Sequence, residues 1–357
     1  MKKKRVTIRQ AAPGMVAGED IYTYNNQLII TEGTKLTDKI ITRLKFYSIS
    51  DFKIIVEWDK KPEAKEPSHI QQIRESVEFK QFNTSFMESL GNFKSELNNI
   101  SASDKTLDVS ALLNHTANIL GSSRNGIHVF DMLHCMREFD DITYVHSINV
   151  SLIASVFGGW LKLPEKEVEV LMLCGLLHDI GKLTLPPEII SKQDSLTETE
   201  FTKVKTHTLK GYQILKNKAI DDRVKFTALM HHERCDGSGY PHGFHGPQIN
   251  SFAKIIAIAD VYDAMTSARV YRPALCPFEA ISVFETEGFQ KFDPHYIMTF
   301  LQEIVLSYVG KRVRLSDKTE GEVRMINKNY LSKPIIQLSN GFIDLSKEHD
   351  LVIEAIL

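Results

Sequence analysis

The strongest constraint on the fold is a long, almost wholly helical segment, from about residue 125 to residue 308, in which histidines and aspartates interrupt apolar runs. Apolar residues recur there at the spacing of helices that bury one face. A histidine or an aspartate is costly inside such a helix unless it has a hydrogen-bond partner or a metal. The segment therefore predicts a helical bundle with polar groups gathered where its helices end.

Seven residues of this kind stand at or near the ends of apolar runs. They are His146, His178, Asp179, His207, His231, His232 and Asp260. Each alone is more often structural, but together these imidazoles and carboxylates can converge as ligands of two divalent ions. Such a mixed set suits iron, manganese or zinc better than calcium or magnesium, and no thiolate joins it. We therefore expect a metal centre rather than a structural zinc site.

Composition narrows the class of protein. The 43 basic and 45 acidic side chains leave a net charge of -2, which does not favour a bulk nucleic-acid binder. The four cysteines lie far apart without CxxC spacing, which argues against a zinc ribbon and a disulfide framework. No apolar run approaches the roughly 18 residues of a spanning helix, and the basic start is not followed by the apolar stretch of a signal peptide. We expect a cytoplasmic protein with no membrane partner.

The remaining segments predict smaller units around the helical one. Residues 1–60 alternate like short strands around one amphipathic stretch, which indicates a small α+β module, and residues 309–357 return to strand-like alternation with an Asn-Gly turn. Residues 61–124 predict a linker and a helical connector, which either forms a homodimer contact or packs within one subunit. The fold class is therefore mainly α, with a bundle at 125–308 flanked by small β-rich modules.

The order of these residues resembles the HD metal-dependent phosphohydrolases over roughly residues 125–305. The match sharpens at residues 231–241, which read HHERCDGSGYP and fit the motif of the HD-GYP cyclic di-GMP phosphodiesterases without a gap. The resemblance implies a helical HD-GYP bundle and a cyclic dinucleotide as the partner. It also implies iron or manganese as the metal.

Ligand roles follow from the resemblance. It implies one metal held by His146, His178, Asp179 and Asp260, with Asp179 bridging to a second metal at His207, His231 and His232. Some family members hold a third metal through a glutamate four residues before the first helical histidine. That position is Ile142 here, so we expect two metals, with Asp140 or Asp141 as the candidate replacements.

Several further residues are candidates for substrate and catalytic roles. Two metals about 3.5–4 Å apart can generate a bridging hydroxide that attacks the phosphodiester. Lys182, on the face of His178 and Asp179 if the helix continues, is a candidate to neutralise charge in the transition state; a solvated lysine is the alternative. Arg269 and Arg272 are candidates to hold phosphates, or else surface ion-pair residues. Gly239 and Tyr240 are candidates to contact the substrate, on a stretch that without the resemblance would indicate only a turn, and Asp263 is a candidate to orient a ligand or Lys182.

The expected reaction is hydrolysis of cyclic di-GMP to linear pGpG, with GMP as a further product left open. Hydrolysis of a hybrid cyclic GMP-AMP uses the same chemistry and is not separated by the motif. A catalytically weak sensor of cyclic dinucleotides is the alternative from another class, but every expected ligand residue is present. A general nucleotide phosphohydrolase is disfavoured by the intact Gly-Tyr-Pro string.

Overall fold

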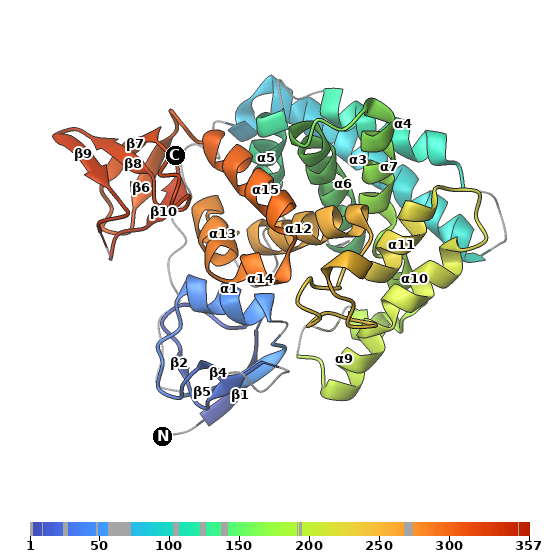
Figure 1. Ribbon diagram of the computed structural model, residues 1–357, viewed down its shortest axis with the longest axis horizontal. Helices are drawn as coiled ribbons and strands as arrows, with labels where there is room; N and C mark the ends of the chain where they lie inside the picture. Colours follow the sequence, from blue (N-terminus) through green and yellow to red (C-terminus); the bar gives the residue numbers. More distant parts are fainter. Residues whose placement is uncertain are drawn as a thin grey trace.

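A computed structural model shows a helical body with a small module at each end of the chain (Figure 1). It describes residues 3–8, 10–23, 28–47, 49–55, 73–102, 107–121, 126–136, 142–190, 192, 195–267, 274–348 and 350–357. The mainly α fold with β-rich ends is therefore confirmed. Within the described ranges, none of the helices combines the length and the apolar character needed to cross a membrane.

The N-terminal module joins two small antiparallel sheets and one helix. Its elements are β1 Lys3–Thr7, β2 Val16–Ala17, β3 Ile21–Tyr22, β4 Leu28–Ile30, α1 Asp38–Phe46 and β5 Asp51–Ile55. The strands order as β1-β5-β2, with β3 paired to β4. The Oγ1 of Thr37 accepts a hydrogen bond from the Ile40 amide and so caps the start of α1. Leu44 and Phe52 belong to a core that is separate from that of the helical body.

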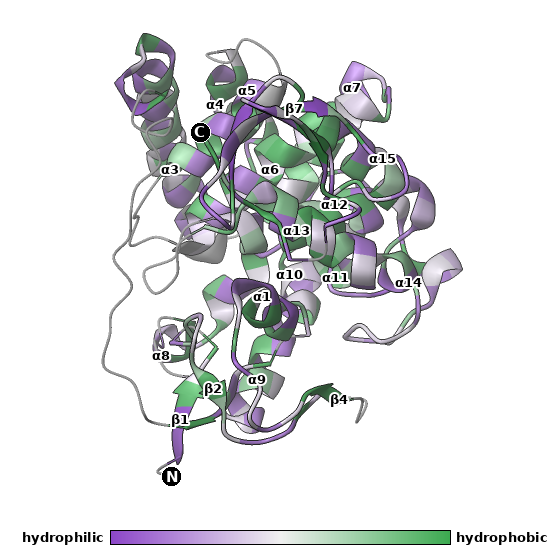
Figure 2. Cartoon of the chain, turned by 90° about the vertical axis from the view of Figure 1, so that its left-hand side faces the viewer, coloured by the Kyte–Doolittle hydropathy of each residue, from purple (hydrophilic) through white to green (hydrophobic). Residues whose placement is uncertain are grey.

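The helical body is built around α6 and α12, which run through its centre and are largely apolar (Figure 2). Its α-helices are α3 Val77–Ala102, α4 Val109–Gly121, α5 Gly126–Cys135, α6 Ile142–Trp160, α7 Glu165–Leu177, α8 Pro187–Ile190, α9 Glu198–Lys205, α10 His207–Leu215, α11 Asp222–Met230, α12 Ser251–Thr266, α13 Pro277–Val283, α14 Phe289–Lys291 and α15 Pro294–Leu306. Two 3-10 turns, η1 Ile180–Thr184 and η2 Gly246–Gln248, and one π-helical turn, η3 Phe284–Gly288, complete it.

The apolar stripe on α3 packs inside the same chain. Phe82, Phe86, Leu90, Phe93 and Leu97 are buried in the core that also holds α6 and α12. Of the two alternatives for this helix, a homodimer contact or packing within one subunit, the structure shows packing within the subunit. These side chains are unavailable to a second subunit, so the homodimer stays a prediction that would need another face of α3.

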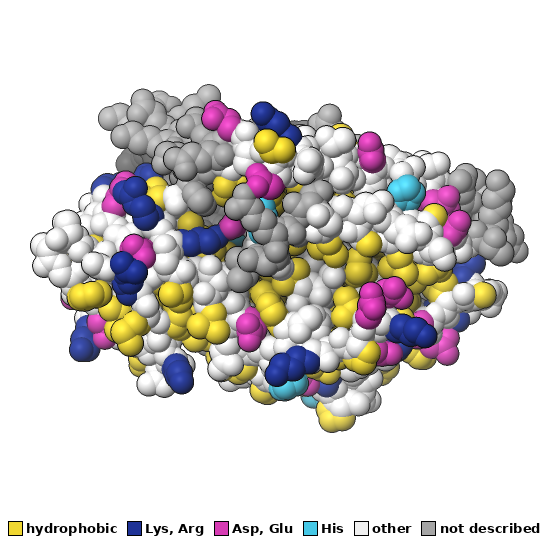
Figure 3. Space-filling view, turned by 90° about the horizontal axis from the view of Figure 1, so that it is seen from above, with side chains coloured by type: hydrophobic (Ala, Val, Ile, Leu, Met, Phe, Trp, Pro, Cys, Tyr) yellow, Lys and Arg dark blue, Asp and Glu magenta, His cyan; other side chains and the backbone are white. Residues whose placement is uncertain are grey.

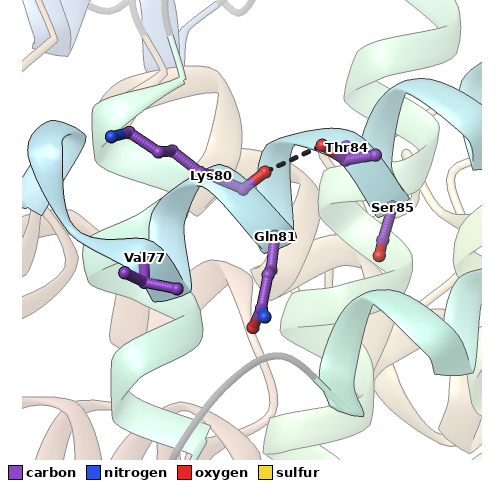
Figure 4. A pocket seen from close by; sticks show the side chains of 5 residues that line it. All are labelled: Val77, Lys80, Gln81, Thr84 and Ser85. Carbon is purple, nitrogen blue, oxygen red and sulfur yellow. Dashed lines mark hydrogen bonds between the residues drawn. The ribbon is translucent and has the colours of Figure 1, made fainter.

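A surface hollow of about 450 Å³ lies on an outer face of α3 (Figure 4). Val77, Lys80, Gln81, Thr84 and Ser85 line it, and none of the seven candidate metal ligands is among them. Its lining includes one charged side chain and no carboxylate or imidazole. We therefore do not place the functional site there.

The C-terminal module is a five-stranded antiparallel sheet in the order β10-β6-β7-β8-β9. The strands are β6 Arg312–Leu315, β7 Glu320–Met325, β8 Ile335–Leu338, β9 Gly341–Asp344 and β10 Ile353–Ile356. Leu338 pairs with Gly341, so the turn lies at Ser339-Asn340, one residue before the expected Asn-Gly pair, and Gly341 already belongs to β9. Val313 and Ile336 belong to the core of the helical body, so this sheet packs on it directly. The exact domain boundaries stay a prediction.

Charges of both signs are interspersed over the molecular face in Figure 3, with no broad field of one sign. This distribution agrees with the nearly balanced net charge. Any anionic ligand therefore depends on local groups rather than on a general positive surface.

Candidate metal centre

The helices of the body bring all seven candidate ligands to one place. His146 lies in the first turns of α6, His178 caps the C-terminus of α7 with Asp179 next, and His207 opens α10. His231 caps α11 with His232 next, while Asp260 lies inside α12, which continues to Thr266. The expectation of polar groups near helix ends therefore holds for the histidines, but Asp260 is an interior helix residue.

Two groups of ligand atoms form, each within 4.8 Å. We call His146, His178 and Asp260 the His146 cluster, and Asp179, His207, His231 and His232 the His207 cluster. All are buried except His232, which is partly exposed. Residues from five helical elements thus converge on a single buried site.

The carboxylate of Asp179 faces both clusters at once. Its Oδ2 lies 3.3 Å from His178 Nε2 and 3.8 Å from His146 Nε2. Its Oδ1 lies 3.3 Å from His207 Nε2 and 3.6 Å from His231 Nε2. One oxygen therefore addresses each cluster, which is the arrangement a bridging carboxylate needs.

Hydrogen bonds fix the ring orientation of the four most buried histidines. His178 Nδ1 lies 2.7 Å from the carbonyl of Gly175, His207 Nδ1 lies 2.6 Å from that of Val204, and His231 Nδ1 lies 3.1 Å from that of Thr227. Because a carbonyl only accepts, each Nδ1 must carry the proton. The Nε2 atoms are left to face the site with their lone pairs.

Asp263, one turn after Asp260, contacts the fourth ring rather than Lys182. Its Oδ2 lies 2.7 Å from His146 Nδ1, and its Oδ1 accepts hydrogen bonds from Asn149 and Ser267. A buried carboxylate behind a histidine fixes its tautomer and raises its basicity as a ligand. The Nε2 of His146 then points at Asp260 Oδ1, 3.0 Å away.

Buried nitrogen and oxygen atoms that lack hydrogen-bond partners make the site suitable for a cation. His178 Nε2 and Asp179 Oδ1 are buried and meet no hydrogen-bond partner of suitable geometry among the described residues. His207 Nε2 and His231 Nε2 lie only 3.2 Å apart. Since both rings carry their proton on Nδ1, these two lone pairs face each other, an arrangement that a shared cation relieves. Imidazole and carboxylate donors without thiolate suit a catalytic divalent transition metal.

Burial and neighbouring charges move the pKa values of the two clusters apart. Burial lowers the pKa of His146, but hydrogen bonds to Asp260 and Asp263 outweigh it and raise the pKa to about 9. Burial lowers the pKa of His231 to about 4, since its contact with Asp179 compensates only in part. Burial also disfavours the charged form of Asp260, yet its partners, His146 first, hold its pKa well below the usual value.

The chain after Asp179 departs from the expected continuing helix. Residues 180–184 form the 3-10 turn η1 instead, so the α-helical face argument for Lys182 was wrong. Gly181 explains the tight packing, because a Cβ atom there would lie 1.9 Å from the carbonyl oxygen of His207. The missing side chain lets η1 lie directly on α10 and brings Asp179 next to His207.

Lys182 nevertheless reaches the centre. Its Nζ donates a hydrogen bond to Asp179 Oδ2, and its side chain is a quarter exposed. The ammonium therefore lies between the buried carboxylate and solvent, where a phosphate could approach. Burial disfavours the charged carboxylate, but Lys182 and the nearby imidazoles hold the pKa of Asp179 well below its usual value.

The glycine-rich loop closes over the His207 cluster. The ring of Tyr240 stacks on His232 with centroids 4.6 Å apart. Gly239 lies against the backbone, since a Cβ there would be 2.4 Å from Glu233 Cα, and Gly237 takes a positive φ of 79°. Tyr240 thus forms a wall beside His232, and Gly239 permits the close approach that puts it there.

Glu233, which the sequence did not single out, fixes the path of this loop through hydrogen bonds to its backbone. Its carboxylate is buried and accepts the backbone N–H groups of His242 at 2.8 Å and Phe244 at 3.0 Å. An acidic side chain within the matched string was the available signal. Only the fold, however, reveals that it faces inward to two amides rather than toward the metal site.

Several candidates fall outside the described residues. Arg269 and Arg272 lie in the gap at 268–273, and Asp140 and Asp141 lie in the gap at 137–141. Ile142 begins α6, but its side chain is also outside the description. Their expected roles stay predictions.

Comparison with known proteins supplies a family match. A family model described as the HD domain matches residues 115–296, which contain all seven candidate ligands. The chain is 37% identical over 190 residues to "Cyclic di-GMP phosphodiesterase PA4108" of Pseudomonas aeruginosa, covering 53% of this chain and 45% of that protein. It is 38% identical over 145 residues to "3'3'-cGAMP-specific phosphodiesterase 1" of Vibrio cholerae, covering 41% of this chain and 34% of that protein. The chain thus spans less than half the length of these two curated relatives.

A solved structure shares the overall fold. Bd1817, an HDG"Y"P protein from Bdellovibrio bacteriovorus, superposes with a TM-score of 0.51 over 84% of this chain and 98% of that one. The sequences are 16% identical, so the likeness concerns the fold alone.

Proposed function

The chain belongs to the HD domain family, and from that membership we propose that it is a metal-dependent phosphodiesterase of the HD-GYP type. Its proposed reaction is the hydrolysis of cyclic di-GMP to linear pGpG. The observation that carries the proposal is the Asp179 carboxylate, with one oxygen toward each cluster of imidazoles. Such a carboxylate suits two adjacent cations better than one.

We assign the ligands by these distances. His146, His178 and Asp260 would hold one metal, His207, His231 and His232 the other, and Asp179 both. Iron or manganese is proposed as the metal, because the resemblance to the HD-GYP family implies these two ions among those that an imidazole and carboxylate set suits. When bound, two such ions lower the pKa of water and polarise the phosphodiester.

The chain's own residues prepare the site for an anionic substrate. Lys182 adds a positive charge beside Asp179, and its partly exposed ammonium can turn to a phosphate oxygen as charge develops there. Tyr240 and His232 offer a flat aromatic surface next to the centre, against which a nucleobase can stack. Asp263 keeps His146 in the tautomer that ligation requires.

Cyclic GMP-AMP is the second candidate substrate, supported by the name of the matching Vibrio cholerae protein. Both dinucleotides present the same phosphodiester to the metals, so they differ only in contacts to one base. A catalytically weak sensor remains the alternative outside the enzymes. The cytoplasmic location also stays a prediction.

The test is to purify the full chain without oxygen, measure its metals by elemental analysis and incubate it separately with each dinucleotide. Chromatography of the products should show pGpG from cyclic di-GMP, with about two metals per chain. Faster turnover of cyclic GMP-AMP would replace the substrate in the proposal. A metal-loaded protein that cleaves neither dinucleotide would support the sensor and refute the enzyme.

A further inference from the structure

The N-terminal module touches the helical body through the end of α1, close to the chain segment that carries two of the candidate ligands. In Figure 1, α1 lies beside α13 and α14. Phe46, the last residue of α1, packs against the core of the helical body, whereas the next residue, Tyr47, packs against the core of its own module. The two rings thus join the two cores at one point.

Lys291 and Phe292 receive this contact on the side of the helical body. The Nζ of Lys291 lies 3.5 Å from the ring centroid of Tyr47 and 4.4 Å from that of Phe46. The ring of Phe292 meets Phe46 edge to face, with centroids 5.9 Å apart. Cation–aromatic and aromatic pairs of this kind are directional, so they fix the relative position of the two segments.

The same two residues hold the chain just after the histidine pair. The carbonyl oxygen of Lys291 accepts a hydrogen bond from the Cys235 amide at 2.7 Å. The guanidinium of Arg234 lies over the ring of Phe292, with its Cζ 5.0 Å from the centroid. Lys291 and Phe292 therefore have the N-terminal module on one side and residues 234–235 on the other.

Arg234 carries the connection to the metal site. Its Nη1 donates hydrogen bonds to the carbonyls of His231 at 3.1 Å and Glu233 at 2.9 Å. Because the guanidinium packs on Phe292 and binds these carbonyls, it restricts the backbone that carries the imidazoles of His231 and His232. The neighbouring His146 cluster has no such link through these contacts, since its residues stand on α6, α7 and α12.

An ion pair reinforces the interface from the preceding π-helical turn. Glu287, whose side chain is 8% exposed, lies with its Oε1 2.7 Å from Arg43 Nε of α1. Two residues earlier in the turn, Glu285 accepts the backbone N–H of Ser332 from the C-terminal module at 3.0 Å. A π-helical turn of this kind is uncommon and often marks functional positions. Here it places two carboxylates, two residues apart, against the two terminal modules.

We propose that Lys291 and Phe292 are positioning residues, through which the docking of α1 sets the affinity of the His207 cluster for its metal. The N-terminal module then acts as a regulatory element: whatever loosens its contact frees residues 231–235 and weakens that cluster. The inference deepens the proposed function by assigning a means of control to the same site, and it rests on that proposal only for the binding of a metal.

The test uses Phe46→Ala in the full chain, with Tyr22→Ala as the matched control. Both variants remove an aromatic ring from the N-terminal module, but Tyr22 is 45% exposed and lies on β3. Metal-free protein is titrated with Co²⁺, whose absorption reports its ligands, and backbone hydrogen exchange is measured over residues 231–236. We expect Phe46→Ala to weaken one of the two Co²⁺ binding steps by about tenfold, which is at the low end of the loss seen when a residue that supports a metal ligand is changed. The same variant should speed hydrogen exchange over residues 231–236.

Wild-type Co²⁺ affinity and exchange in Phe46→Ala would overturn the proposal, and so would an equal weakening of both binding steps, which indicates general destabilisation. If Phe46→Ala does not fold, Lys291→Met replaces it, because the side-chain stem is kept while the ammonium is lost; the same two outcomes decide. Hydrolysis is measured separately. A protein that cleaves no dinucleotide but shows the selective loss of Co²⁺ affinity refutes the proposed function alone.

Discussion

The two clusters of the centre differ in how the fold supports them. The His146 cluster stands on the central helices, where Asp263, Asn149 and Ser267 form a hydrogen-bonded network behind its first histidine. In the His207 cluster, His207 is the first residue of α10, while His231 caps α11 and His232 follows it, with the glycine-rich loop beside them. One cluster therefore rests mainly on long central helices, and the other on the ends of two nine-residue helices and on the residues that follow them.

The two clusters should therefore differ in how strongly local contacts control their geometry. Interior helices move little without repacking the core, whereas the ends of helices and their loops respond to local contacts. We therefore expect the His146 cluster to depend on its own hydrogen bonds and the His207 cluster to depend on neighbours such as Gly181 and Glu233. Variants can be chosen that separate the two dependences.

Among the variants that leave all seven candidate ligands in place, the largest effect is expected from Lys182→Ala, which acts on the oxygen of Asp179 that faces the His146 cluster. Without the ammonium, turnover of cyclic di-GMP should fall about 10²–10³-fold, as for other losses of a transition-state charge donor, while metal content stays near normal. Steady-state rates and elemental analysis on the same preparation measure both. Lys347→Ala, at a side chain that is 80% exposed, is the control. Equal loss of metal and turnover would instead indicate a structural lysine.

Asp263→Asn should weaken the His146 cluster selectively. The amide can still accept from Asn149 or Ser267, but an NH₂ group facing His146 Nδ1 favours the tautomer with the proton on Nε2, which cannot ligate. We expect a loss of about 10–100-fold in affinity for one of two metals in a titration of metal-free protein. A loss at both metals would show that the clusters are not supported separately. Asp222→Asn, at a carboxylate that is 75% exposed, should bind as the unaltered chain does.

Gly181→Ala should disturb the His207 cluster through packing. A new Cβ atom 1.9 Å from the His207 carbonyl must push η1 away from α10. Overpacking of this kind costs about 1–3 kcal/mol, which thermal unfolding can measure. The control is Gly159→Ala, because nothing lies within 4 Å of a Cβ at that helical position and alanine favours the helix. Equal melting temperatures of the two variants would contradict the close packing.

The number of protons released on metal binding should also differ between the two clusters, although this effect is smaller than those of the variants above. The pKa of His146, about 9, keeps it protonated near neutral pH, so a metal must displace a proton there. The pKa of His231, about 4, leaves it already neutral. Calorimetry in buffers of different ionisation enthalpy should find that proton release falls as pH rises through about 9. Release that stays constant over this range would contradict the assignment.

The same shifts give opposite pH windows for the stability of the metal-free chain. The raised pKa of His146 contributes stability that is fully present below about pH 6.5 and lost as pH rises through about 9. The lowered pKa of His231 contributes stability above about pH 6.5 that is lost as pH falls toward about 4. Denaturant unfolding at a series of pH values between about 4 and 9 measures the free energy of unfolding in both windows.

The sequence predicted the mainly α fold and the candidate ligands because polar groups beside apolar helical runs leave a local signal. Other features leave none. The 3-10 turn after Asp179 depends on how closely Gly181 approaches α10, and the inward direction of Glu233 depends on the path of a loop. The contact of Phe46 with Phe292 joins residues far apart in the chain, so no periodicity could reveal it. Arg269 and Arg272 remain sequence predictions.

Asp179→Ala tests the central claim most directly, because the Asp179 carboxylate places one oxygen toward each cluster. Purified without oxygen, this variant should keep its helical circular dichroism, lose most of both metals by elemental analysis, and give no measurable pGpG from cyclic di-GMP. Asp222→Ala, prepared in parallel, should match the unaltered chain in all three. If Asp179→Ala retained full phosphodiesterase activity with a normal metal content, the bridged two-metal centre would be wrong.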